Sequence, residues 1–121
     1  QMKRELRQLI ALQTPRTAQQ RRQWAVWLDL WAEAARSTAV GDLHAEYYRQ
    51  WRETVADVVR RGVARGSFRP VDPETAALAL TALIDGLATQ VLATAPGTDA
   101  EAMHTALLTY VDSTLTAPAP Q

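Results

Sequence analysis

Residues 73–95, PETAALALTALIDGLATQVLATA, constrain the fold of this 121-residue chain more than any other stretch. They have the length of a helix and are apolar on almost every side, with Asp85 near the centre. A membrane span is disfavoured, because a central aspartate costs roughly 2.5–3.5 kcal/mol on insertion and no basic anchor follows. We therefore expect a helix that protein covers on more than one side.

The rest of the chain also predicts helices and no strand. Alanine, leucine, arginine and glutamine, which are good helix formers, are abundant, whereas clusters of β-branched residues are few. Hydrophobic residues make up 47% of the chain, enough for the core of one domain. We predict an all-α fold, a five-helix bundle in a single domain. The predicted helices span about residues 2–13, 17–37, 40 or 42–65, 73–95 and 99–115.

Local signals mark several helix ends. Thr17 with Gln20, and Thr98 with Glu101, have the three-residue spacing of a capping box, which indicates that a helix begins at each threonine. Gly66 follows the third helix and is typical of a left-handed cap.

The last two predicted helices each have apolar residues on two faces. A chain of 121 residues can cover one face of each but lacks the mass to cover the other. We expect a twofold homodimer in which these helices pair with their copies as an intermolecular four-helix bundle. Gly86 would suit a close crossing there, since a helical glycine costs about 1 kcal/mol relative to alanine. The alternative is a tight crossing within the monomer. The predicted interface residues are Ala79, Leu83, Gly86, Leu87, Gln90, Met103, Leu107, Tyr110 and Val111.

Three of the four tryptophans lie in one short stretch, WAVWLDLW at 24–31, where spacings of three and four place them on one side of a helix. Large rings suit the wall of a pocket, with HAEYYRQW at 44–51 as the facing wall. Such a site fits a flat hydrophobic molecule or, through cation–π contacts, an organic cation. The competing interpretation is that one or two tryptophans, Trp24 above all, simply fill the core. The candidate ligand-binding residues are Trp24, Trp27, Trp31, His44, Tyr47, Tyr48, Trp51 and Asp85.

Two polar residues of this set have alternative interpretations. Thr81, Asp85 and Thr89 recur every four residues, and we favour a solvated edge of an otherwise buried helix. In the alternative, the strip faces the pocket and the carboxylate balances a cationic ligand. We interpret His44 as a hydrogen-bonded wall residue rather than as a proton or metal switch.

The segments WLDLWAEAARS at 27–37, GVARGSFRPVD at 62–72 and LIDGLATQ at 83–90 follow one another in a recognisable order. Over about residues 20–93 the chain resembles the C-terminal regulatory domain of tetracycline-repressor (TetR) family transcription factors. Within that family it is most similar to the repressors of choline–betaine genes.

The resemblance implies a ligand-responsive transcriptional regulator, usually a repressor, that is a homodimer through its last two helices. The preceding helices would enclose an effector pocket. An N-terminal helix-turn-helix domain that binds operator DNA is absent from residues 1–121, which we expect to be the regulatory part of a longer protein. As given, the chain should not bind an operator.

Other functions find less support in the residues. The chain has no cysteine, its three serines lie outside any nucleophile motif, and neither histidine belongs to a metal-binding spacing. We therefore expect no catalysis, cofactor, metal or membrane partner, and a cytoplasmic protein. A small helical enzyme, or a helical interaction module without a small-molecule effector, is the alternative. The net charge of the chain is zero, and the excess of basic residues in its N-terminal part is too small to bind nucleic acid alone.

Overall fold

The computed structural model describes residues 2–118, and within that range it is all-α, as predicted, with no strand. Five α-helices follow one another and a single wide π turn extends the last of them. Their bounds are α1 Met2–Gln13, α2 Ala18–Ala34, α3 Thr38–Ala64, α4 Pro73–Leu92, α5 Ala100–Tyr110 and η1 Val111–Leu115.

Most helix ends lie where local chemistry places them. Thr17 and Gln20 form the predicted capping box, in which the threonine side chain accepts from the Gln20 N–H. Asp72 accepts a hydrogen bond from Thr75 N–H, and Pro73 fills the first turn of α4. Gly66 has a φ of +78°, the left-handed conformation expected after α3.

Two predicted helix starts are wrong. Asp99 rather than Thr98 caps α5, because its carboxylate accepts from Ala102 N–H and leaves Glu101 free to pair with Arg16. Ser37 caps α3, so this helix begins at Thr38, and the preceding helix already ends at Ala34.

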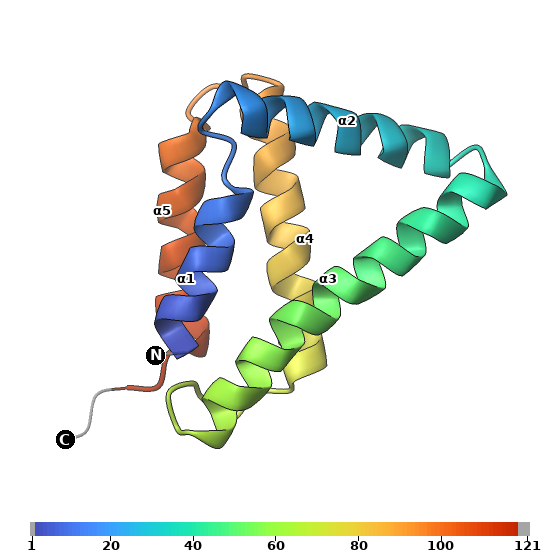
Figure 1. Ribbon diagram of the computed structural model, residues 1–121. Helices are drawn as coiled ribbons and strands as arrows, with labels where there is room; N and C mark the ends of the chain where they lie inside the picture. The colour runs from blue at the N-terminus through green and yellow to red at the C-terminus, as the bar shows by residue number, and fades with distance from the viewer. Residues whose placement is uncertain (1, 119–121) are drawn as a thin grey trace.

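Helix α4 lies in the middle of the molecule, between α3 on one side and α5 and α1 on the other (Figure 1). Its fully buried residues include Ala77, Leu80, Ile84 and Ala88, which belong to one continuous core with residues of α1, α3 and α5. By length and composition α4 could cross a membrane, but the core helix of a soluble protein passes the same test. Because its buried residues pack against α1, α3 and α5, protein covers this apolar helix on several sides, as predicted.

Helices α2 and α3 diverge from a sharp turn at residues 35–37 and form a wedge, with α1 and α4 at its open side (Figure 1). Arg61 of α3 pairs with Glu5 of α1 at 2.9 Å, and Arg16 of the α1–α2 turn pairs with Glu101 of α5 at 2.6 Å. These ion pairs are partly exposed and contribute little stability, so the packing of apolar faces holds the wedge.

The predicted dimer interface needs a correction on its α5 side. Met103, Leu107 and Val111 have no exposed surface, because they pack into the core of the monomer. The α4 side differs: Ala79, Gly86 and Gln90 are exposed, and Leu83 and Leu87 are partly exposed, as is Tyr110. A Cβ added to Gly86 would meet nothing within 4 Å, so a tight crossing within the monomer does not explain this glycine.

Candidate functional site

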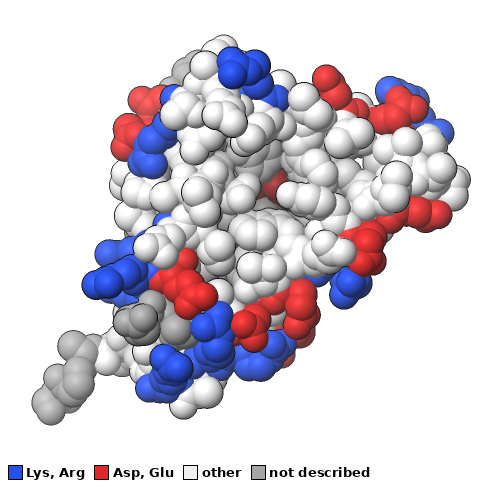
Figure 2. Space-filling model, viewed as in Figure 1, with Lys and Arg blue, Asp and Glu red and all other residues white. Residues whose placement is uncertain are grey.

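A cavity of about 370 Å³ lies between α1, α2 and α3, with α4 at its base. Figure 2 shows a hollow on this face, surrounded by uncharged residues, with a small acidic area at its bottom. Its lining residues are Leu12, Gln13, Gln20, Gln23, Trp24, Trp27, Tyr47, Tyr48, Trp51 and Asp85. The volume lies at the small end of the range for ligand pockets in proteins.

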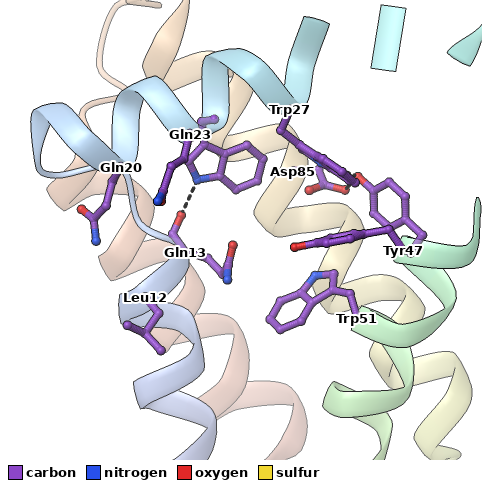
Figure 3. Close-up of a pocket in the computed structure, with 10 residues that line it drawn as sticks. Leu12, Gln13, Gln20, Gln23, Trp27, Tyr47, Trp51 and Asp85 are labelled. Atoms are coloured by element: carbon purple, nitrogen blue, oxygen red, sulfur yellow. Dashed lines mark hydrogen bonds between the residues drawn. The ribbon is translucent and has the colours of Figure 1, made fainter. Parts of the chain in front are cut away.

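The tryptophans of α2 meet the tyrosines of α3 across the wedge. The ring of Trp27 lies 4.5 Å from that of Tyr47 and 5.4 Å from that of Tyr48, measured between centroids. Trp51 lies one turn further along α3 and reaches into the same space (Figure 3). The two facing walls that the sequence predicted are therefore adjacent. Their spacing of three and four residues along each helix keeps these rings on one face.

Trp24 both fills the core and lines the cavity. It is nearly fully buried, and its indole N–H donates to the Gln13 carbonyl at 2.7 Å (Figure 3). This bond satisfies the polar atom of the ring and ties the start of α2 to the end of α1.

Asp85 is buried at the base of the cavity, with only 6% of its surface exposed, and Thr81 is buried beside it. The favoured interpretation of this strip as a solvated edge is therefore wrong. The carboxylate of Asp85 faces Tyr48 of α3, and helix periodicity alone did not reveal which neighbour would cover it. Within the described part of the chain, Asp85 is the one charged residue that lines the cavity.

The hydroxyl of Tyr48 connects the two walls to this carboxylate. It donates a hydrogen bond to Asp85 Oδ2 and accepts one from the Trp27 indole N–H at 3.4 Å. Burial raises the pKa of the Asp85 carboxyl to about 6, against the opposing effect of the hydrogen bond from Tyr48. Burial, and then the bond to Asp85, also raises the pKa of the Tyr48 hydroxyl above its usual range. Tyr48 thus remains a donor while Asp85 titrates near neutral pH.

Two predicted site residues do not line the cavity. His44 stacks on the outer side of Trp27 at 4.6 Å, and Trp31 lies 6.2 Å from both His44 and Tyr48. They form a second layer that supports the lining rings, and Trp31 is 38% exposed. The Nε2 atom of His44 is buried without a hydrogen-bond partner in the described part of the chain, and burial lowers the pKa of this imidazole. The prediction that His44 is a hydrogen-bonded residue of the cavity wall is therefore wrong, because its Nε2 atom has no partner among the described residues and the residue does not line the cavity.

Four lining residues escaped the sequence analysis: Leu12, Gln13, Gln20 and Gln23. A signal existed for two of them, because Gln20, Gln23 and Trp27 recur at spacings of three and four and so share a helix face. No such signal existed for Leu12 and Gln13, whose position depends on how α1 packs beside α2. Within residues 2–118, no group of three or more histidine, cysteine or acidic residues could hold a metal ion.

The comparisons of sequence and of structure with known proteins both find transcriptional regulators. The sequence model of the family described as BetI-type transcriptional repressor, C-terminal, matches residues 2–116. A protein from Saccharomonospora viridis, described as a transcriptional regulator and solved in complex with choline, has 32% sequence identity and a TM-score of 0.94. The similarity covers 97% of this chain and 61% of that one. No curated protein matches the sequence.

A second solved structure, described as a TetR-family transcriptional regulator from Rhodococcus sp., has a TM-score of 0.87 at 24% identity. The similarity covers 93% of this chain and 60% of that one, and it shows that the two chains share a fold. The chain thus spans about three fifths of the length of each of these two structures.

Proposed function

This chain belongs to the family of BetI-type transcriptional repressor C-terminal domains, and we propose that its cavity binds an organic cation that controls a transcriptional regulator. The match covers residues 2–116, and the similar solved structures are regulators rather than enzymes. In this proposal the chain is the effector-binding and dimerisation part of the regulator.

One observation supports the cationic effector above all: a single buried carboxylate lies at the base of an aromatic cavity. Asp85 has no charged partner among the lining residues, and its pKa of about 6 reflects the cost of burying an unpaired negative charge. A cation beside Asp85 would remove that cost. The faces of Trp27 and Tyr47 would add cation–π attraction, worth about 2 kcal/mol or more where water is excluded.

The same observation disfavours the flat neutral ligand that the sequence also allowed. A neutral apolar molecule would displace water from Asp85 without replacing its hydrogen bonds, and so would increase the desolvation of the carboxylate. A quaternary ammonium group fits better, because it carries charge but needs no hydrogen-bond acceptor. Choline in the structure of the Saccharomonospora viridis protein belongs to this class and is the natural first probe.

The remaining parts of the proposal concern the whole protein. Helix α4 presents Ala79, Leu83, Gly86 and Leu87 on a face that the monomer leaves at least partly exposed, and a second copy would cover it. DNA binding would come from a helix-turn-helix domain that precedes the regulatory domain, with repression as the mode of control. Such a regulator works in the cytoplasm, where its operator lies.

Calorimetric titration of choline into the domain tests this function. We expect binding in the wild type and at least about 30-fold weaker binding in Asp85→Asn, since loss of a buried charge partner costs 2 kcal/mol or more. Asp29→Asn is the matched control, because Asp29 is an exposed aspartate of α2 outside the cavity.

The neutral alcohol in which carbon replaces the choline nitrogen provides a second comparison. It has nearly the same shape but no charge, and should bind far more weakly than choline. Equal binding of choline by Asp85→Asn, or equal binding of the two ligands by the wild type, would contradict the proposal.

A further inference from the structure

The mouth of the cavity has two exposed apolar side chains on opposite walls. Leu12 of α1 is 68% exposed and Tyr47 of α3 is 57% exposed, although both line the cavity. Figure 3 shows Leu12 on the α1 side of the cavity and Tyr47 on the α3 side. Exposed leucine at the rim of a pocket is a surface that an apolar ligand group would cover favourably.

The cavity is larger than a small quaternary ammonium alcohol requires. At about 30 Å³ per non-hydrogen atom, the share of one water molecule in the liquid, a volume of about 370 Å³ holds roughly twelve such atoms. Choline has seven. With its ammonium group beside Asp85, the remaining space lies between the base and the mouth.

Three glutamines also line the cavity: Gln13, Gln20 and Gln23. The Oε1 atom of Gln20 already accepts from the N–H groups of Arg16 and Thr17, so its amide NH₂ is the group left to donate. Amide groups can donate to a carbonyl or ether oxygen and can accept from a hydroxyl. Among residues 2–118, no lysine or arginine lines the cavity, so a carboxylate on the ligand would have no ionic partner there.

We propose that this pocket takes a monocation longer than choline: an ammonium head, a neutral polar linker such as an ester, and a short apolar tail that lies between Leu12 and Tyr47. The inference rests on the proposed function, because Asp85 must hold the head. Each part of the ligand then meets one layer of the cavity: carboxylate and rings at the base, amides in the middle, apolar side chains at the mouth.

Titration of a series of choline esters with acetyl, butyryl and hexanoyl tails tests the proposal. In the wild type we expect affinity to exceed that for choline and to rise about two- to fourfold for each added methylene group that Leu12 and Tyr47 cover. A tail of the same length that ends in a carboxylate should lose this gain, because nothing in the cavity pairs with the charge.

Leu12→Ala should flatten the dependence on tail length, so that it weakens binding of the hexanoyl ester more than binding of choline. Leu78→Ala is the matched control, because Leu78 is another exposed leucine, 54% accessible, that lies on α4 outside this cavity. Circular dichroism establishes that both variants are folded.

The outcomes separate the two proposals. If choline binds but longer tails add nothing, the tail site is refuted while the cation site stands. If tails add affinity equally in wild type and Leu12→Ala, the tail lies elsewhere and the inference is also refuted. If neither choline nor any ester binds, the proposed function fails, and the tail site fails with it.

Discussion

Replacing Gly62 with alanine should destabilise the domain, although alanine is the better helix former. Gly62 lies near the end of α3, and a Cβ there would come closer than 3.0 Å to the Cδ2, Cε2 and Cγ atoms of Phe68. Contacts that short do not persist, so the ring or the helix must move. The Cγ atom lies on the Cβ–Cγ axis, so rotation of the ring about that bond does not move it away from the new methyl group.

Phe68 has little freedom to retreat. Only 2% of its surface is exposed, and the N–H groups of Ser67 and Phe68 both donate to the Gly62 carbonyl, at 2.9 and 3.1 Å. Phe68 also pairs with Thr116 across an isolated antiparallel bridge, which ties the turn to the end of the chain. A shift of the ring therefore disturbs the turn and the C-terminal segment together.

The expected magnitude follows from two opposing effects. Overpacking a buried site costs typically 1–3 kcal/mol, and the tethered ring places Gly62→Ala near the upper value. Alanine recovers about 1 kcal/mol through its helix propensity. The net loss in free energy of unfolding should be about 2 kcal/mol, or roughly 10 °C in melting temperature.

Urea denaturation at a fixed protein concentration measures this change, since any dimerisation makes stability depend on concentration. Gly86→Ala is the matched control: its Cβ meets nothing within 4 Å, so the monomer should gain stability from propensity alone. Phe68→Leu supplies a double-mutant cycle, in which Gly62→Ala should cost less once the ring is absent. Wild-type stability in Gly62→Ala would refute the reasoning, because it would show that the ring has room to move.

Four further predictions concern protonation and assembly. Choline affinity should rise as pH increases through about 6, because the cation attracts only ionised Asp85 and Tyr48 stays protonated; Asp85→Asn should remove this dependence in calorimetric titrations. Without ligand, the contribution of Asp85 to stability is fully present below its unfolded pKa of 3.8 and is lost as pH rises through about 6, which denaturation of wild type and Asp85→Asn in parallel would measure. Ala79→Glu should give a helical monomer in sedimentation experiments, because it places charge on the exposed α4 face, and a dimer of unchanged affinity would exclude that face. Leu107→Glu should instead unfold the domain, since Leu107 is buried within the monomer.

Much of the fold could be predicted because its signals are local. The cap at Thr17 involves Gln20, three residues away, and the left-handed turn at Gly66 is a property of one backbone position. The predicted cap at Thr98 was wrong, because the adjacent Asp99 takes that position. Adjacent residues can both accept from the first turn, and the pairing of Glu101 with Arg16, 85 residues earlier, favours Asp99.

The candidate site could be predicted only in part. Trp24, Trp27, Tyr47, Tyr48 and Trp51 were identified because large rings recur at helical spacing on two segments. The same periodicity could not tell a lining ring from one in the layer behind it. Placing a residue in one layer or the other depends on the angle between α2 and α3, which no local signal encodes.

The sequence by itself predicted a helix over residues 73–95 that protein must cover, and the helix forms over Pro73–Leu92. It also indicated that Asp85 would be costly wherever apolar residues surrounded it. Only the tertiary structure decided which neighbour covers each face. Helix α5 turns Met103 and Leu107 into the monomer core rather than toward a second copy, and η1 does the same with Val111. Helices α2 and α3 pack against Asp85, so that little of its surface meets water. The physical reason is that periodicity groups residues onto faces, whereas burial of a face is a property of two helices and of the angle at which they pack.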